Sequence, residues 1–434
     1  MRILLLNQNW FADEWRKAGH TVISCGRYPY LDVHIPDKVF HIQDVLTDYF
    51  SGFEPDRIVI YDDSSPITFA GLDDLEVPLF FYSVDTHHHF ERHRELRAAV
   101  DGMVVAQADY LDYMTATGES VGWMPLWASV EYGGEPHSKE FDACFVGTLN
   151  PILNPRRVEF LKRLQSCAPI TVTSGIFADI FPKSHIILNQ TVKQDLNFRV
   201  FEAMISGSLV LTERINNRLF DLFREGEHLV TYTPDDHLDA AEKIAFYRSQ
   251  PEEARRIGEA GRAEILRAHL PRHRAAQLLD EVEKVTYQRE RQRHIGMMTN
   301  HVYLSKVLRA EPRRLSQVRA LAAAMIALDR ALQSEESITL GQASLAAVGC
   351  LEYDSILGSK AGSILLARAA EAWHQYPFLQ VVRIWTLLQQ GETEEARRHA
   401  ERVFPEQSEE MCNRAAEITG MVINAYGGSP ATVP

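Results

Sequence analysis

The chain has 434 residues, with 59 acidic and 45 basic side chains and a formal net charge of −14. This length exceeds what one hydrophobic core normally serves, so two or three domains are expected. An acidic chain has no general positive field that would attract nucleic acid or anionic lipid. We therefore do not expect a nucleic-acid partner. Hydrophobic residues make up 45% and charged residues 24%, as in ordinary globular proteins.

The five cysteines are scattered and include no Cys-x-x-Cys pair. A disulfide framework or a zinc site is therefore not expected, and a reducing compartment fits. Cys25 and Cys144 lie in or beside apolar runs and are interpreted as small core residues. The apolar run at the N-terminus is too short for a signal peptide, and no uninterrupted apolar stretch could span a bilayer. We expect a cytoplasmic protein without a membrane span.

The first part of the chain alternates short apolar runs with helical spacing. A helix is expected over 11–19, with Gly19 as its stop. Strands separated by helices pair in parallel through right-handed crossovers, so a doubly wound sheet is predicted. The expected strands are 3–6, 21–24, 57–61, 79–84, 102–105 and 124–127.

A polar stretch over 128–140 is the best linker candidate, and a second α/β pattern begins after it. Its expected strands are 141–146, 170–173, 186–189, 209–212 and 229–232. Its expected helices are 156–165, 197–205, 236–249 and 251–269. This pattern predicts a second doubly wound domain.

From about residue 274 onward no strand is expected. One long polar helix is predicted over 274–292, followed by helices over 315–332, 363–374, 379–389 and 392–403. The segment LLQQGETEEARRHAERV (387–403) resembles one helix–turn–helix unit of a tetratricopeptide-like array, although three copies at a fixed period are not found. The predicted domains are therefore 1–130, 141–273, a crossover helix over 274–294 and a helical interaction domain over 295–434, with a loose tail over 427–434.

The most informative segment is NQTVKQDLNFRVFEAMISGSLVLTE (189–213), which reads as strand, loop, helix, glycine turn and strand. Asn197, Arg199 and Glu202 fall near the start of the helix, where free N–H groups and the positive end of the helix dipole favour a diphosphate. A carboxylate one turn into the helix can accept hydrogen bonds from a ribose diol. Ligands bind at this edge of parallel sheets. The alternative for Glu202 is a carboxylate that only complements the helix dipole.

FRVFEAMISGSLVLTE resembles the donor-site motif of group-1 GT-B glycosyltransferases, and is closest to the branch named after spore-maturation and spore-coat enzymes. FVGTLNPILNPRR (145–157), LFREGEHLVTYTPDD (222–236) and HLPRHRA (269–275) also resemble segments of that family. The resemblance covers about residues 141–283. It implies two Rossmann-like domains in the GT-B arrangement, here followed by an all-α domain, with the helix after residue 274 packing back on the first domain.

The resemblance also implies roles for individual residues of the second domain. Glu202 is expected to bind the ribose hydroxyls, and Arg199 is expected to contact the diphosphate and to act in catalysis by neutralising it. Many relatives carry a second acidic residue eight positions earlier, where this chain has Gln194 next to Asp195. The other residues expected to bind the donor are Gly147, Thr148, Ser174, Gly175, Lys193 and Asn197, and Arg156 is a further cation that could face the diphosphate.

A second cluster, SVDTHHHF (83–90), follows an apolar strand and should emerge at the edge of the first sheet that faces the second domain. Asp85 and His87 are candidate catalytic residues, because a side chain there could orient or deprotonate an acceptor hydroxyl. The alternative is a polar loop with a residue that caps a helix. His88 and His89 are weaker candidates, and adjacent histidines on a loop make a poor metal chelate.

The first strand-to-helix turn reads NQNW (7–10) and contains no glycine, which disfavours dinucleotide binding by the first domain. In the GT-B arrangement this turn faces the acceptor, so Asn7 and Asn9 are candidate acceptor contacts. A helix cap is the alternative interpretation.

Together these features predict an enzyme that transfers a sugar from a nucleoside diphosphate sugar to a hydroxyl group, without a cofactor or a metal. A UDP-sugar is favoured, and GDP- or dTDP-sugars are possible donors. The branch implies retention of configuration. The helical tail suggests a protein or glycan acceptor, such as a bacterial surface protein like flagellin. The alternatives are a sugar-nucleotide epimerase of the same fold, or an inactive scaffold whose tail binds protein.

Overall fold

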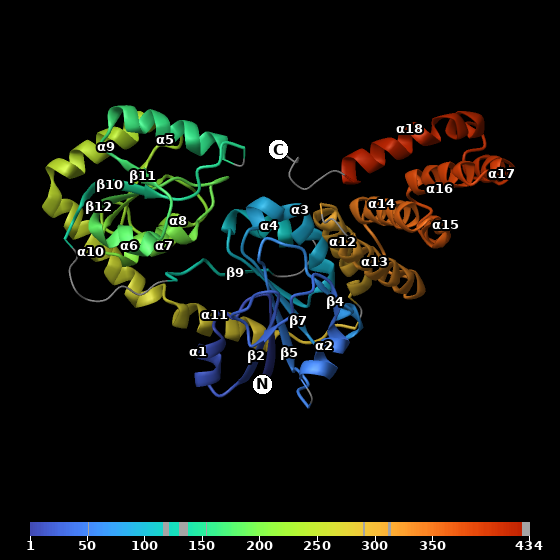
Figure 1. Ribbon diagram of the computed structural model, residues 1–434, viewed down its shortest axis with the longest axis horizontal. Coiled ribbons are helices and arrows are strands. Elements are labelled where there is room, and N and C mark those ends of the chain that lie inside the picture. Colours follow the sequence, from blue (N-terminus) through green and yellow to red (C-terminus); the bar gives the residue numbers. More distant parts are fainter. Residues whose placement is uncertain are drawn as a thin grey trace.

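In the computed structural model the chain forms two parallel α/β lobes followed by an array of helices (Figure 1). The structure describes residues 1–50, 52–115, 121–129, 138–152, 154–289, 291–310 and 314–427. We call residues 1–129 the N-lobe, 138–270 the C-lobe and 293–427 the helical tail. The predicted fold class, two Rossmann-like sheets and an all-helical region, is confirmed.

The N-lobe contains a seven-stranded parallel sheet in the order β3-β2-β1-β5-β7-β8-β9. Its central strands are apolar on both faces because helices cover both sides of the sheet. The strands are β1 (Arg2–Leu6), β2 (Thr21–Gly26), β3 (Val33–His34), β5 (Arg57–Tyr61), β7 (Leu79–Ser83), β8 (Gly102–Val105) and β9 (Gly122–Trp123), beside the small pair β4 (Phe40–His41) and β6 (Phe69–Ala70). The helices are α1 (Ala12–Lys17), α2 (Ile42–Tyr49), α3 (Thr86–Leu96) and α4 (Leu111–Thr115), with single 3-10 turns at Leu72–Asp74, Arg97–Ala99 and Ala108–Tyr110.

The strand expected over 124–127 is wrong. The sheet ends with β9, and Met124 makes the last ladder contact through its N–H to the Val105 carbonyl at 3.0 Å. Residues 124–127 are apolar because Met124, Leu126 and Trp127 are buried between the lobes. Burial against a second domain therefore produced the pattern that suggested a strand.

The C-lobe contains a five-stranded parallel sheet in the order β11-β10-β12-β13-β14, close to the expected pattern. The strands are β10 (Phe141–Val146), β11 (Thr171–Thr173), β12 (Ser184–Asn189), β13 (Leu209–Glu213) and β14 (Val230–Tyr232). The helices are α5 (Pro155–Cys167), α6 (Phe177–Ile180), α7 (Phe198–Ile205), α8 (Leu219–Leu222), α9 (His237–Ser249) and α10 (Pro251–Ala268), with a 3-10 turn at Phe181–Lys183. Of the linker expected over 128–140, residues 130–137 lie outside the described ranges.

Helix α11 (Pro271–Lys284) runs from the C-lobe onto the N-lobe, as the resemblance implied (Figure 1). The Trp15 indole N–H donates to the Ala275 carbonyl at 2.9 Å, and the Gln277 amide donates to the Trp123 carbonyl at 2.9 Å. The single helix expected over 274–292 is wrong, because the chain is extended at Val285. The N–H of Gln288 then donates to the Asp101 carboxylate at 3.1 Å, which ties this segment to the N-lobe.

The helical tail begins with α12 (Arg293–Leu308), which belongs to the N-lobe as much as to the tail. The Asn300 amide accepts from the Ile67 N–H and donates to the Ile67 carbonyl, both at 2.8 Å. A Cβ at Gly296 would lie 2.7 Å from the Ala99 Cβ, so only glycine allows this close approach. The remaining helices are α13 (Leu315–Gln333), α14 (Leu340–Leu357), α15 (Ala361–Ala372), α16 (Pro377–Gln389), α17 (Thr393–Val403) and α18 (Ser408–Gly427).

Helices α12, α14 and α18 were not expected from the sequence. Helices α12 and α14 are buried around much of their circumference, so they lack the one-sided apolar spacing that identifies a surface helix. The predicted helix–turn–helix over 387–403 is present, with Gly391 in the left-handed region between α16 and α17. The loose tail expected beyond Gly427 lies outside the described residues. Among the helices described, none has the length and apolarity that crossing a membrane requires.

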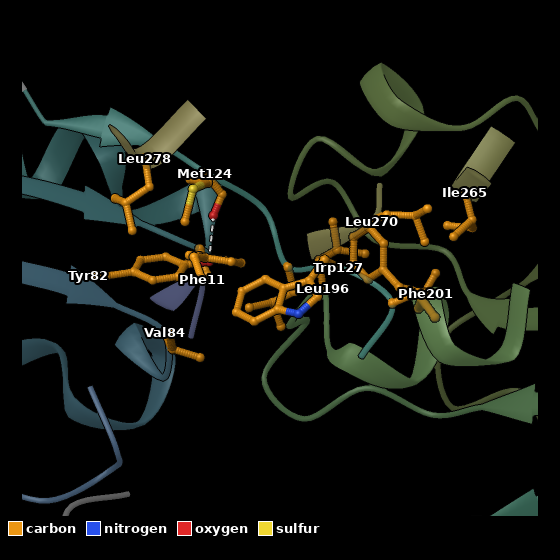
Figure 2. Packing of buried hydrophobic residues seen from close by; sticks show 14 of the residues in the cluster. Phe11, Tyr82, Val84, Met124, Trp127, Leu196, Phe201, Ile265, Leu270 and Leu278 are labelled. Atoms are coloured by element: carbon orange, nitrogen blue, oxygen red, sulfur yellow. Dashed lines mark hydrogen bonds between the residues drawn. The ribbon is translucent and has the colours of Figure 1, made fainter. Parts of the chain in front are cut away.

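The two lobes share one hydrophobic core that is centred on Trp127 (Figure 2). The Trp127 ring lies 4.7 Å from Phe11 of the N-lobe and 5.0 Å from Phe198 of the C-lobe, between ring centroids. Only 4% of Trp127 is exposed. The Tyr82 hydroxyl, drawn with its hydrogen bond in Figure 2, donates to the Met124 carbonyl at 3.0 Å and fixes the chain just before this ring.

Candidate active site

The carboxyl ends of the strands in both lobes face a common cavity of about 280 Å³, which we call the interlobe cavity. Parallel α/β sheets place ligand-binding loops at this edge. The N-lobe contributes residues that follow β1, β5, β7 and β8, and the C-lobe contributes the segment between β12 and α7. The lining includes Gln8, Trp10, Tyr28, Asp62, Asp63, Asp85, Gln107, Asp195, Asn197 and Phe198.

Arg199 on α7 lies against Gly147 at the end of β10, so two residues that were each expected to contact the donor are neighbours. The Nε of Arg199 donates to the Val146 carbonyl and its Nη1 to the Asn189 side-chain oxygen, both at 3.0 Å. A Cβ at Gly147 would lie 2.6 Å from Nη2, so glycine is required for the guanidinium to occupy this place. Burial lowers the pKa of Arg199 to about 10, which still leaves it cationic. A fixed cation therefore lies beside a strand-end turn, an arrangement suited to an anion.

Glu202, one turn further along α7, is turned toward the segment that joins the lobes. Its carboxylate accepts a short hydrogen bond from the Ser129 hydroxyl. Burial raises the pKa of Glu202, while the Ser129 bond and nearby Arg199 act in the opposite direction. The Ser129 hydroxyl thus occupies the place that is expected for a ribose hydroxyl. The Glu202 carboxylate accepts a hydrogen bond from it, as it would from the ribose.

Asp195 and Asn197 line the interlobe cavity, whereas exposed Gln194 faces away from it. The Asp195 carboxylate accepts from the Val192 N–H at 2.6 Å, and burial raises its pKa. Asn197 precedes the first residue of α7, and its side-chain oxygen is buried without a partner among the described residues. The resemblance implied an acidic residue at position 194. In this chain the acidic residue of the loop is Asp195, one position later.

The remaining donor candidates lie at the rim of the C-lobe. Thr148, Ser174 and Gly175 are in exposed turns after β10 and β11. Lys193 is exposed, has a positive φ of 52°, and lies near His87 and His88 of the other lobe. Arg156 is engaged elsewhere, since it pairs with Glu213 at 2.7 Å and with Asp235.

Asp85 stands at the start of α3, with its carboxylate close to the Ser64 hydroxyl. Its position depends on Asp62, which follows β5 and is buried. The Asp62 carboxylate accepts from the N–H groups of Val84 and Asp85 at 3.1 and 2.7 Å. Burial would raise the pKa of Asp62, but His93, Arg92 and these hydrogen bonds lower it overall, so it is ionised.

The histidines 87–89 begin helix α3 rather than forming the expected loop. His87 is buried, with Nε2 3.9 Å from Asp195 Oδ2 and with Nδ1 lacking a partner among the described residues. Burial lowers the pKa of His87 to about 4, so its imidazole is neutral near neutral pH. The exposed His88 and half-buried His89 line one cavity together with His87, and the pKa of each is also lowered by burial.

The two asparagines expected to contact an acceptor occupy different environments. Asn7 is buried, has a positive φ of 76°, and donates its side-chain amide to the Tyr61 carbonyl at 3.0 Å. Asn9 is exposed, and its carbonyl accepts from the Ala12 N–H. The residues of this turn that line the interlobe cavity are instead Gln8 and Trp10.

Sequence reasoning missed Asp62, Asp63 and Gln107. Asp62 and Asp63 follow the apolar run of β5, so the strand-end position that identified Asp85 could have found them. Gln107 connects the lobes: its side-chain oxygen accepts from the Leu196 N–H at 2.9 Å and from the Asn217 amide at 2.6 Å. Carboxylates, amides and aromatic rings dominate the cavity wall, which suits a neutral ligand rich in hydroxyl groups better than an anion.

Asp73, Asp74 and His294 are close enough to share a cation, with one ligand atom of each within 4.8 Å of the others. These groups already form ion pairs. His294 Nδ1 lies 2.8 Å from Asp73, and Arg330 pairs with Asp74. The group lies where α12 and α13 meet the N-lobe, away from the interlobe cavity, and is explained as a structural network.

Residues 171–280, about a quarter of the chain, match a protein-family model described as glycosyl transferase-like. The matched segment includes α7 with Arg199 and Glu202. No curated protein sequence matches the chain.

Several solved structures match the chain at low identity over about two thirds of its length. A sucrose-phosphate synthase from Thermosynechococcus elongatus is 12% identical, with a TM-score of 0.45, over 64% of this chain and 98% of that one. A glycosyltransferase from Rickettsia africae is 11% identical, with a TM-score of 0.45, over 65% and 98%. Anabaena HepE, solved with UDP and glucose, is 11% identical, with a TM-score of 0.45, over 66% and 100%.

Proposed function

We propose that this protein is a glycosyltransferase that moves a sugar from a nucleoside diphosphate sugar to a hydroxyl group of an acceptor. The observation that carries the proposal is the packing of Arg199 against Gly147, one helical turn from Glu202, within the segment that matches the glycosyl transferase-like family model. This geometry supplies a fixed cation for a diphosphate and a carboxylate for a ribose diol at one end of α7.

In the proposed complex the nucleotide lies along the C-lobe and the transferred sugar enters the interlobe cavity. Asp195 and Asn197 are placed to accept or donate hydrogen bonds to sugar hydroxyls, because both line that cavity. Trp10 and Phe198, one from each lobe and 6.2 Å apart between ring centroids, together give the cavity an apolar edge. The acceptor approaches from the N-lobe, past Asp85 and Gln8.

Catalysis would rest on positioning and on charge. As the bond between the sugar and the diphosphate breaks, negative charge grows on the leaving phosphate, and the guanidinium of Arg199, held by its hydrogen bonds to Val146 and Asn189, stabilises it. Asp85 is placed to receive or orient the acceptor hydroxyl, while neutral His87 supports Asp195 from the N-lobe. We favour a UDP-sugar as donor and retention of configuration.

A panel of UDP-, GDP-, dTDP- and CMP-sugars tests the proposal by thermal shift and by slow hydrolysis without acceptor. We expect one nucleotide to raise the melting temperature and its sugar to be released as free sugar. Recovery of an epimerised nucleotide sugar would support an epimerase instead. If no nucleotide shifts the melting temperature and none is hydrolysed, the proposed function fails.

A further inference from the structure

Two hollows adjoin along α3 of the N-lobe. The first, the tail cavity, has a volume of about 950 Å³ and lies between α3 and helices α12, α14 and α18. The second, of about 680 Å³, lies at the lobe boundary between Tyr110 and Tyr113 of the N-lobe and Gln194 of the C-lobe. Phe90 and Lys193 line both, so the hollows form one long groove. The tail cavity alone reaches the upper end of the range of about 300–1,000 Å³ that small-molecule sites occupy, so the long groove suits an extended ligand.

Charged side chains of the tail cavity are neutralised by one another or by a group behind them. Arg94 pairs with Glu91 at 2.5 Å and with Glu95 at 3.3 Å. Arg92 lies 3.6 Å from the buried carboxylate of Asp62. These contacts account for both carboxylates and both arginines of the lining.

The two lysines of the long groove are balanced as well. Lys306 is only 6% exposed, its ammonium lies 4.8 Å from the centre of the Tyr303 ring, and it is attracted by Glu352. Lys193 is exposed and shares the lobe-boundary hollow with Asp109. The groove therefore offers no excess of charge of either sign, which disfavours a polyanion and favours an uncharged ligand.

Aromatic rings are distributed along the whole groove. Tyr303 and Tyr426 line the tail cavity, Phe90 lies where the hollows meet, and Tyr110 and Tyr113 line the lobe-boundary hollow. Tyr113 is 62% exposed, and its ring lies 5.9 Å from that of Phe90 between centroids. The C–H faces of sugar rings pack on aromatic rings of this kind, while their hydroxyl groups bond to polar side chains nearby.

Polar groups beside these rings can serve such hydroxyl groups. His88, Gln194 and Asn216 bring planar imidazole and amide groups to the lining. His87 also lines the tail cavity, is 6% exposed, and has an Nδ1 without a partner among the described residues. None of the described residues that line the groove belongs to a strand, so an extended peptide would find no sheet edge there to pair with.

The long groove runs beside the place where transfer is proposed. Asp195 lines the interlobe cavity, and its neighbour Gln194 lines the lobe-boundary hollow. His87, whose Nε2 is 3.9 Å from Asp195 Oδ2, lines the tail cavity. A chain that lies in the groove therefore passes next to the residue to which the donor sugar is assigned.

We propose that the long groove binds an uncharged oligosaccharide, which is the acceptor of the transferred sugar. The helical tail then selects acceptors several sugar units long, because a monosaccharide would cover only part of the groove. That the oligosaccharide is the acceptor rests on the proposed function; that the groove binds one does not.

Isothermal titration calorimetry on the full chain tests this with maltohexaose, cellohexaose and chitohexaose, each compared with the disaccharide of its own series. We expect at least one hexasaccharide to bind about tenfold or more tightly than its disaccharide, because it fills more of the groove. Tyr113→Ala and Tyr426→Ala, at the two ends of the groove, should each weaken hexasaccharide binding about tenfold, since each removes a packed ring. Tyr49→Ala is the matched control, because Tyr49 is 56% exposed, as against 62% for Tyr113, and lies on α2 outside the groove.

The inference is overturned if no hexasaccharide binds, if none binds more tightly than its disaccharide, or if both groove variants keep full affinity. A heparin hexasaccharide that binds more tightly than the neutral ones would overturn it as well, because the groove would then be an anion site. Glu202→Gln should weaken nucleotide binding and leave hexasaccharide binding unchanged. If the chain binds a hexasaccharide but no nucleotide sugar, the proposed function alone fails; if it binds and hydrolyses a nucleotide sugar but binds no hexasaccharide, this inference alone fails.

Discussion

His87 of the N-lobe and Asp195 of the C-lobe face each other across the lobe boundary, with Nε2 and Oδ2 3.9 Å apart and both side chains buried. Burial lowers the pKa of His87 to about 4 and raises the pKa of Asp195. The imidazole is therefore uncharged near neutral pH and contributes a polar contact rather than an ion pair. Asp195 lines the interlobe cavity, in which the donor sugar and the acceptor are proposed to meet.

Asp195→Asn should lower kcat by roughly 10- to 100-fold while leaving nucleotide affinity almost unchanged, because the carboxylate faces the sugar and not the nucleotide. Transfer rates and calorimetric titration of the nucleotide measure the two effects separately. Asn217→Ala also disturbs the lobe boundary but removes no carboxylate, and serves as the control. An equal loss in nucleotide affinity would contradict the assignment of Asp195 to the sugar.

The pH dependence of transfer should show no step that belongs to His87 between about pH 5.5 and 8, since a group with a pKa of about 4 keeps one protonation state throughout that range. Comparing pH profiles of the unchanged protein and of His87→Gln checks this. We expect parallel profiles. A step near pH 6.5 that disappears in the variant would show that His87 titrates as an ordinary exposed histidine.

Glu202→Ala should weaken nucleotide binding by roughly 1–3 kcal/mol, the worth of hydrogen bonds from a diol to a carboxylate. Ser129→Ala is the matched comparison, because Ser129 donates to the same carboxylate from the protein itself. Removing that hydroxyl should leave affinity equal or higher. Calorimetry of both variants with UDP measures the difference, and affinity unchanged by Glu202→Ala would refute the ribose assignment.

Gly147→Ala should reduce nucleotide binding about tenfold or more, because the added methyl would lie 2.6 Å from Arg199 Nη2 and would displace the guanidinium. The methyl would also lie 3.0 Å from the ring of buried Phe145, so circular dichroism and thermal unfolding are needed to separate lost affinity from a disturbed C-lobe core. Gly420→Ala, at a helical site with no atom within 4 Å of the new methyl, is the control for adding a methyl group. Retained affinity in Gly147→Ala would show that Arg199 does not contact the phosphates.

Lys306→Met should stabilise the fold near neutral pH by about 1–3 kcal/mol, because one pKa unit corresponds to about 1.4 kcal/mol. Burial lowers the pKa of Lys306 from 10.5 to about 8, so the unfolded chain binds more protons between these values and the stability of the unchanged protein rises with pH there. The advantage of the methionine variant should therefore shrink between about pH 8 and 10. Urea unfolding at several pH values measures it, and a destabilised variant would indicate a structural role for the ammonium.

Asn300→Ala should destabilise the N-lobe by about 2 kcal/mol, because it removes two buried hydrogen bonds to the Ile67 backbone. Asn424→Ala, an exposed position on α18, should have almost no effect. Thermal unfolding of both variants tests whether α12 is part of the N-lobe. The same contacts mean that a truncation starting inside α12 would unfold the N-lobe rather than report on the tail.

Short-range sequence patterns were sufficient to predict the two sheets and the N-terminal end of α7. Apolar runs between helices identify parallel strands without tertiary information, and the segment around Arg199 and Glu202 combines a helix start with a strand end. The same logic applied to the residues after β5 would have found Asp62. A site residue that directly follows a strand can therefore be predicted from the sequence alone.

The features that the sequence did not predict depend on contacts between distant segments. Residues 124–127 were mistaken for a strand because burial between lobes and burial in a sheet give the same apolar pattern. Helices α12 and α14 lack a polar face because other helices surround them. The pairing of His87 with Asp195 joins residues 108 positions apart, and no spacing rule connects them.

The Trp127 indole gives the two lobes a common pivot. Because Phe11 packs on one side of the ring and Phe198 on the other, pulling the lobes straight apart would expose aromatic surface to water, whereas a swivel about the ring would keep it covered. A movement of the lobes that keeps this aromatic surface covered is therefore a rotation about the ring. The fluorescence of the Trp127 indole should report such a rotation, because it depends on how the neighbouring aromatic rings are arranged around it.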